Sequence, residues 1–243
     1  MQISVVIPAK NEQGNVSRLI EEIHEVLHPQ YQFEIVLTDD GSTDNTVDDA
    51  IQAAERLGTA LQVFSHADSC GQSTAVHTAV HHARGHLIAT LDADGQNDPH
   101  DIPSMIEKAF SLENEHFCIA GYRKGRKDTP WVRFQSKVAN RVRHALLKDG
   151  VPDSGCGLKV FPRHTFVLLP YFDHMHRFLP ALIRRLNGKI VIHPVNHRDR
   201  IEGVSKYTVW NRLWVGIVDL IGVAWLIRRT KWPTIKRAYR SNE

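Results

Sequence analysis

Four short apolar runs in the first 91 residues alternate with three amphipathic segments, and this alternation limits the fold more than any other feature. The run at 3–7 is almost wholly apolar and ends at Pro8, which is typical of a strand buried on both faces. Apolar residues then recur at helical spacing from 16 to 27. The order repeats through strands at 33–38, 60–65 and 86–91 and helices at 46–57 and 73–84, with Gly58 and Gly85 as the expected helix ends. These βαβ units predict an α/β fold, with a mostly parallel sheet and helices on both faces.

Three of the four strands lead into unusually polar loops. In open α/β sheets, ligands bind beyond the carboxyl ends of the strands. We therefore expect the three loops to lie side by side at one edge of the sheet. They are Pro-Ala-Lys-Asn-Glu at 8–12, Asp-Asp-Gly-Ser-Thr-Asp at 39–44 and Asp-Ala-Asp-Gly-Gln at 92–96.

Asp92 and Asp94 stand one residue apart directly after a strand, where both can point oxygen atoms into one crevice. Mg²⁺ and Mn²⁺ prefer such carboxylates, completed by phosphate and water, and Gln96 can add a neutral oxygen. Asp and Gly are also ordinary turn residues, so an isolated Asp-x-Asp is compatible with a plain turn. In the neighbouring loop Asp44 suits a helix cap. The strand-end carboxylate of Asp39 can instead accept a hydrogen bond from a nucleobase or a ribose hydroxyl.

In this order, the three loops resemble those of family 2 glycosyltransferases, which have the GT-A fold. The resemblance implies a domain over 1–207, divided into a donor and metal half (1–120) and an acceptor half (121–207). It implies that Asp39 holds the nucleobase and that Gly71 leads a helix whose free N–H groups face the donor phosphates. The implied Mg²⁺ or Mn²⁺ ligands are Asp92, Asp94 and Gln96. The implied donor-binding residues are Pro8, Glu12, Asp39, Gly71, Gln72, Asp92 and Ala93.

Charge is divided unevenly between the two halves. Residues 1–120 carry 19 acidic and 5 basic side chains, whereas residues 121–243 carry 8 and 25. A basic surface of this kind meets an anion, such as phosphate, a nucleic acid or a membrane. We exclude a nucleic acid, because the basic segments lack a recognised module and the interleaved aromatic residues of an RNA platform. Lys127, Arg141 and Arg143 fit a solvated helix face.

The segment 198–207, Arg-Asp-Arg-Ile-Glu-Gly-Val-Ser-Lys-Tyr, is similar to one in the branch of dolichyl-phosphate mannose synthases and bacterial undecaprenyl-phosphate glycosyltransferases. This resemblance implies inverting transfer of a sugar from a nucleotide-diphosphate sugar to a polyprenyl phosphate, and leaves open which sugar, nucleobase and prenyl length are used. The implied acceptor-phosphate ligands are Arg123, Arg133, Ser136 and Arg200, and the implied catalytic residues are Asp94, Arg200 and Lys206. One alternative is the same fold acting on a saccharide hydroxyl, with Asp153 as the base. Another is a non-catalytic nucleotide-binding subunit that recruits a membrane partner.

The most apolar segment, 213–227, has fifteen residues. As a helix it would be about 22 Å long, shorter than a hydrocarbon core of about 30 Å. Asp219 interrupts it, a basic tail begins at Arg228, and four tryptophans flank or occupy it. We therefore expect 208–243 to form an amphipathic interfacial helix and basic tail, peripheral on the cytoplasmic face of a membrane. A small integral membrane partner would fit this arrangement, and a buried core helix or an oligomer interface is the alternative.

The cysteines and histidines add no metal framework. Cys70, Cys118 and Cys156 have no paired spacing and fit the reduced thiols of a cytoplasmic protein. The first residues lack a secretory pattern. The fifteen histidines include the pair His174 and His176, which we expect to be surface or packing residues.

Overall fold

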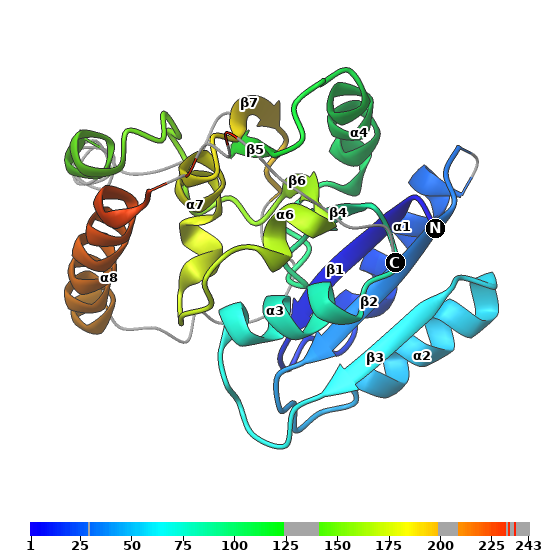
Figure 1. Ribbon diagram of the computed structural model, residues 1–243. Coiled ribbons are helices and arrows are strands. Elements are labelled where there is room, and N and C mark those ends of the chain that lie inside the picture. The colour runs from blue at the N-terminus through cyan, green and yellow to red at the C-terminus, as the bar shows by residue number, and fades with distance from the viewer. Residues whose placement is uncertain (29, 124–140, 199–208, 232, 234–235, 237–243) are drawn as a thin grey trace, which may run out of the picture.

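The computed structural model describes residues 1–28, 30–123, 141–198, 209–231, 233 and 236. In this part of the chain, seven strands form one sheet in the order β3-β2-β1-β4-β6-β5-β7 (Figure 1). Strands β1 to β4 are mutually parallel, β6 is antiparallel to both β4 and β5, and β7 is parallel to β5. The strands are β1 (Ile3–Ala9), β2 (Phe33–Asp39), β3 (Leu61–Ser65), β4 (Leu87–Thr90), β5 (Phe117–Arg123), β6 (Lys159–Pro162) and β7 (Lys189–Val195).

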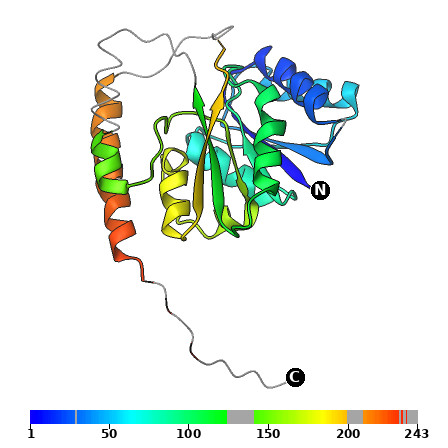
Figure 2. The same ribbon diagram turned by 90° about the horizontal axis from the view of Figure 1, so that it is seen from above.

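Helices cover both faces of the sheet (Figure 2). In β1, Val5 and Ile7 belong to one core with α1, α2 and α4, whereas Val6 belongs to a second core with α3, α6, α7 and α8. Neighbouring strand residues point to opposite faces, so an almost unbroken apolar run supplies both cores. The helices are α1 (Asn15–Leu27), α2 (Thr46–Leu57), α3 (Gln72–His82), α4 (Ile102–Phe110), α6 (Arg163–Val167), α7 (Leu179–Arg185) and α8 (Val209–Arg229), with 3₁₀ turns at Pro99–Asp101 and Met175–Arg177.

Two glycines expected to end helices have different roles. Gly58 ends α2 in the left-handed conformation, at φ 64°, as the sequence predicted. The expectation for Gly85 is wrong, because α3 already ends at His82 and Ala83 is extended. A Cβ added to Gly85 would lie 2.5 Å from the backbone of Ile3. Gly85 is therefore required for the close approach of the chain to β1.

The parallel strands bring the three polar loops to one edge of the sheet, as the sequence predicted. Ala9 at the end of β1 pairs in register with Asp39 at the end of β2. On the other side of β1, Val6 pairs with Thr90, the last residue of β4. The loops at 8–12, 39–44 and 92–96 consequently begin next to one another.

Helix α8 lies on the outer side of the second helical layer (Figures 1 and 2). Its Val223 and Ala224 are buried in the core that also contains Leu182 of α7. Asp219 forms an ion pair of 3.2 Å with His174. None of the helices within the described residues has both the length and the apolar character needed to cross a membrane.

Candidate active site

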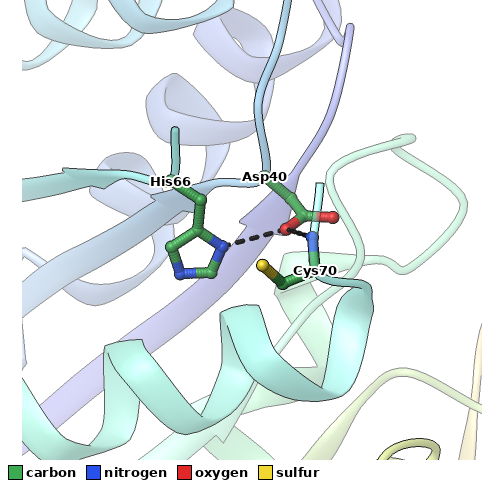
Figure 3. Close-up of side chains that lie close together, drawn as sticks. All are labelled: Asp40, His66 and Cys70. Carbon is green, nitrogen blue, oxygen red and sulfur yellow. Dashed lines mark hydrogen bonds and ion pairs between the residues drawn. The ribbon is translucent and has the colours of Figure 1, made fainter. Parts of the chain in front are cut away.

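Asp40 organises the loop that follows β2. One carboxylate oxygen accepts hydrogen bonds from His66 Nδ1 at 2.9 Å and the Cys70 backbone at 2.8 Å (Figure 3). The other accepts from Ser69 Oγ at 2.7 Å and the Gly71 backbone at 2.9 Å. Burial opposes ionisation, but these hydrogen bonds outweigh it and lower the pKa of Asp40. A charged Asp40 therefore fixes the chain that leads into α3.

The side chains of Asp40, His66 and Cys70 also bring ligand atoms within 4.8 Å of one another (Figure 3). The second ring nitrogen of His66 lies 3.0 Å from Thr78 Oγ1, so both of its nitrogens have hydrogen-bond partners. Cys70 contacts Asp40 through its backbone N–H. We interpret the cluster as a hydrogen-bonded clamp between β2, β3 and α3.

The predicted donor residues of the first two loops lie together. Asp39 is buried, and its Oδ1 accepts a hydrogen bond of 3.1 Å from the Ser42 backbone. The Glu12 backbone donates to Thr46 Oγ1 at 2.8 Å, which ties the first loop to the start of α2. Pro8 lies within β1, opposite Thr38. The two loops therefore lie against each other beside the end of β2.

Two smaller expectations concern these loops. Asp44 accepts from the backbone N–H of Thr46, the first residue of α2, at 3.1 Å, but the N-cap residue of α2 is Asn45, so Asp44 supports the start of the helix from one residue before the cap. The N–H of Gly71 itself donates to Asp40, and the expectation that the free N–H groups at the start of α3 face a donor phosphate stays a prediction. Gly71 itself has φ of 90°, a conformation that favours glycine.

Asp92 is the point where the predicted donor and metal residues meet. Its Oδ1 accepts a hydrogen bond of 2.7 Å from Gln72 Nε2, at the start of α3. Its backbone N–H donates to Asn97 Oδ1 at 3.1 Å. The carboxylate also packs against Gly157, where an added Cβ would overlap it. Gln72 and Gly157, from two distant segments, thus hold the side chain, while Asn97 holds the backbone.

The electrostatics of Asp92 fit a divalent cation. Burial, followed by the nearby charge of Asp94, raises the pKa of Asp92 to about 6. Two close carboxylates with little solvent repel each other, and a bound cation would relieve this repulsion. Carboxylate oxygens with an amide oxygen from Gln96 are a suitable donor set for Mg²⁺ or Mn²⁺. The residues present therefore suit the predicted metal.

The rest of the third loop is fixed by backbone contacts. Asp94 Oδ1 accepts from the Gln96 backbone at 3.1 Å, and Ala93 between the two acids is buried. The Gln96 carbonyl accepts from the Arg198 backbone at 3.0 Å. Arg198 also pairs with Asp98 at 2.6 Å. The described chain thus returns to the Asp94 loop just before the segment that begins at residue 199.

Arg123 and Asp153 form a bidentate ion pair beside this loop. Arg123 Nε and Nη2 lie 2.7 and 2.8 Å from the two oxygens of Asp153. Burial opposes ionisation of Asp153, but the hydrogen bonds and charge of Arg123 lower its pKa. The charge of Arg123 is close enough to favour ionisation of Asp92. This pair places a half-buried guanidinium near the carboxylates.

The sequence reasoning assigned no role to three residues at this edge. Asp40 accepts the backbone N–H groups of Cys70 and Gly71 before α3, and Asn97 accepts that of Asp92. Lys159 is buried on β6, donates to the Cys156 carbonyl and favours ionisation of Asp92. The sequence does contain a signal for Lys159, because this lysine stands within the apolar run Leu-Lys-Val-Phe. Four predicted residues lie outside the described residues, namely Arg133, Ser136, Arg200 and Lys206.

Comparisons with known proteins show which family the chain belongs to. The model of the family described as "Glycosyl transferase family 2" matches residues 4–167. The chain belongs to this family. A family 2 relative, the dodecaprenyl-phosphate galacturonate synthase of Rhizobium johnstonii, is 35% identical over 238 residues, covering 96% of this chain and 69% of the relative. The undecaprenyl-phosphate 4-deoxy-4-formamido-L-arabinose transferase of an Enterobacter species is 34% identical over 211 residues, covering 85% and 63%.

Solved structures confirm the GT-A-like fold of this family 2 glycosyltransferase. A mannosyltransferase from Pyrobaculum calidifontis, in complex with GDP-Man and Mn²⁺, has a TM-score of 0.69 at 19% identity, covering 96% of this chain and 66% of that one. The glucosyl-3-phosphoglycerate synthase of Mycobacterium tuberculosis, with Mg²⁺ and UDP, has a TM-score of 0.67 at 18% identity, covering 93% and 79%. The chain spans about two thirds of the length of its curated relatives.

Proposed function

We propose that this glycosyltransferase moves a sugar from a nucleotide-diphosphate sugar to a polyprenyl phosphate, with inversion at the anomeric carbon. The observation that carries the proposal is the Asp92 carboxylate, with its raised pKa, between Asp94, Gln72 and the guanidinium of Arg123. The two curated relatives named above are a polyprenyl-phosphate synthase and a polyprenyl-phosphate transferase by their names. A donor diphosphate and an acceptor phosphate are the anions that such an edge would bring together.

At the donor end, each residue has a distinct task. Asp39 accepts a hydrogen bond from the nucleobase, and Pro8 and Glu12 line the same side of the donor site. Gln72 holds the Asp92 carboxylate in place. Asp92, Asp94 and Gln96 would hold Mg²⁺ or Mn²⁺, which when bound neutralises charge on the departing nucleotide diphosphate.

The state of Asp153 favours a phosphate acceptor over a saccharide hydroxyl. Attack by a hydroxyl needs a general base, and Asp153 was the residue considered for that task. Both of its oxygens accept hydrogen bonds from Arg123, and its pKa is lowered, so it is a weak proton acceptor. A phosphate monoester has a second pKa of about 6 and is already mostly dianionic at neutral pH. Transfer of a sugar to this phosphate therefore needs no general base.

For the acceptor phosphate we retain the residues implied by the sequence. Arg123 is oriented by Asp153 and still offers part of its five-donor fork. Arg200 and Lys206 follow the point where Arg198 contacts the Gln96 carbonyl. The acceptor residues are Arg123, Arg133, Ser136 and Arg200, with Lys206 between the two phosphates and Asp94, Arg200 and Lys206 as the catalytic set.

We propose that α8 lies in the membrane interface on the cytoplasmic side and belongs to a membrane-associating segment, 208–243, that follows the catalytic domain at 1–207. Its outward residues Val218, Ile221 and Trp225 are exposed, the last two by 61%. Arg228 and Arg229 follow at its end. An exposed apolar face with adjacent basic residues suits anionic headgroups. A small integral membrane partner would use the same face.

The acceptor is tested by supplying radiolabelled nucleotide sugars with polyprenyl phosphate and Mg²⁺ or Mn²⁺. We expect label in the organic-extractable lipid from the wild-type protein and none from a heat-inactivated control. Label that appears only in water-soluble glycan would contradict the polyprenyl acceptor.

The membrane role is tested by flotation with vesicles that contain or lack an anionic lipid. We expect the wild type to float with anionic vesicles and Trp225→Glu to stay behind, because the substitution places a charge on the apolar face. Phe110→Glu, at an exposed apolar residue of α4, is the matched control. Equal flotation of Trp225→Glu and the wild type would contradict the role of α8.

A further inference from the structure

The first turn of α3 is supported from two sides. On one side, Asp40 accepts the backbone N–H groups of Cys70 and Gly71. On the other side lies the segment 171–177, about a hundred residues later in the chain. Between these supports, the Gln72 side chain reaches Asp92. The position of Gln72 thus depends on both supports.

His176 makes two contacts from the segment 171–177 to α3. Its Nδ1 lies 2.7 Å from Ser73 Oγ, and its backbone N–H donates to the same oxygen at 3.1 Å. Ser73 is fully buried. Burial, followed by the charge of Arg177, lowers the pKa of His176 well below its usual value. The ring is therefore neutral at pH 7, and its Nδ1 can accept a hydrogen bond from the Ser73 hydroxyl group.

Two further contacts flank this one. Thr74 Oγ1 lies 2.7 Å from the Tyr171 hydroxyl. A Cβ added to Gly71 would lie 3.6 Å from a carboxylate oxygen of Asp173. Gly71 and Thr74 therefore also face the segment 171–177, whereas Gln72 between them points to Asp92.

We propose that His176 is a positioning residue for the donor site. By fixing Ser73, it holds the first turn of α3 so that Gln72 remains hydrogen-bonded to Asp92. This inference rests on the proposed function for the identity of the ligand, a nucleotide diphosphate bound with a divalent cation. It assigns a role to a histidine that lies far from the polar loops in the sequence.

The test compares His176→Leu with His176→Asn. Asparagine places an acceptor near the position of Nδ1, whereas leucine removes it. We expect His176→Leu to weaken binding of UDP or GDP with Mn²⁺, and to raise the donor KM, by roughly three- to tenfold, the value of one hydrogen bond. The acceptor KM should stay within twofold of wild type. His176→Asn should restore the donor values to within about twofold.

Ser73→Ala removes the same contact from the other side and serves if His176→Leu fails to fold. Its loss should equal that of His176→Leu, and the double variant should lose no more than either single one. His164→Leu, on α6 and exposed, is the matched control. Circular dichroism and thermal unfolding establish which variants are folded.

Wild-type nucleotide affinity and donor KM in a folded His176→Leu, or in Ser73→Ala, would overturn the inference. An equal rise in the acceptor KM would also overturn it, since that indicates a general structural role. If the wild type binds nucleotide with Mn²⁺ but makes no lipid product, the polyprenyl acceptor fails, and the nucleotide affinities still decide the role of His176. If it binds neither nucleotide, the donor assignment and this inference fail together.

Discussion

The two acidic loops at the carboxyl edge of the sheet have opposite electrostatic states. Asp40, in the loop after β2, accepts four hydrogen bonds and has a lowered pKa. Asp92, in the loop after β4, accepts a side-chain hydrogen bond from Gln72 and has its pKa raised to about 6 by burial and by Asp94. Both carboxylates follow parallel strands only one strand apart.

This difference separates architecture from ligand binding. A carboxylate whose oxygens are saturated by donors of its own protein stabilises the fold and has little left for a ligand. A carboxylate is a suitable ligand for a cation when its surroundings in the protein disfavour its ionised form. Asp40 thus holds the chain that leads into α3, whereas Asp92 has the electrostatic state that suits the proposed metal.

The largest effect is expected for Asp94→Ala. Asp94 would hold the cation that neutralises charge on the departing diphosphate, so its removal should lower the rate of sugar transfer by about 10²- to 10³-fold, with the fold intact. The rate is measured by label recovered in lipid. Asp68→Ala, in an exposed part of the neighbouring loop, is the control and should retain the wild-type rate. Unchanged transfer in Asp94→Ala would remove the metal assignment.

Asp40→Ala should instead act on stability. It leaves half-buried donors, including His66 and the Gly71 backbone, without their acceptor, which should lower the free energy of unfolding by about 3 kcal/mol. Urea unfolding measures this change, with Asp68→Ala as the reference. A loss below about 1 kcal/mol would show that the four hydrogen bonds contribute little.

The two acids should also differ in the pH dependence of stability. Because the folded pKa of Asp92 is raised, its ionisation disfavours folding, and its contribution falls as pH rises from about 4 to 6. Metal-free Asp92→Asn should therefore gain on the order of 2 kcal/mol over the wild type between pH 4 and pH 7. Asp40 has the opposite sign, since stability from its lowered pKa is lost as pH falls. Parallel wild-type and Asp92→Asn curves from urea unfolding would contradict the raised pKa.

Gly157→Ala should shift the Asp92 carboxylate. An added Cβ would overlap that carboxylate, so we expect about a tenfold loss of Mn²⁺ affinity, measured by calorimetry. Gly155→Ala is the matched control, because its Cβ would lie 3.3 Å from Arg123 Nη2 and 3.8 Å from Asp153 Oδ1 and would not meet Asp92. Equal Mn²⁺ affinities for the two variants would mean that the contact between residue 157 and the Asp92 carboxylate tolerates a methyl group.

The smallest effect is expected for Cys70→Ser. Cys70 binds Asp40 through its backbone, and its side chain is exposed. Stability should change by less than about 0.5 kcal/mol, and transfer by less than twofold. A clear loss of metal affinity in calorimetry would instead indicate that Asp40, His66 and Cys70 form a metal site.

Local features of this fold were predictable from the sequence. The apolar runs gave the first four strands, and the predicted bounds of α2 and its end at Gly58 match the structure. The ends of three parallel strands placed Asp39, Asp92 and their neighbours at one edge. Strand β6 was not derivable in this way, because an antiparallel strand inserted between β4 and β5 depends on partners distant in sequence.

The candidate active site likewise combines residues that the sequence identified with contacts that only the fold created. The sequence identified Asp92 and Gln72 separately, but only the fold joined them at 2.7 Å. It offered Asp153 as a base, whereas the ion pair with Arg123 makes it a weak one. His176 was expected to be a packing or surface residue, and the fold placed it against Ser73.

The order of residues by itself determined the strand–helix alternation, the polar loops at the strand ends and membership of the glycosyltransferase family. These properties depend on periodicity and on short spacings, which a chain carries before it folds. Tertiary structure alone decided which carboxylate is satisfied and which is not. Burial and hydrogen-bond partners come from segments 20 to 100 residues away, so the ionisation of Asp40 and Asp92 is fixed only when those segments meet.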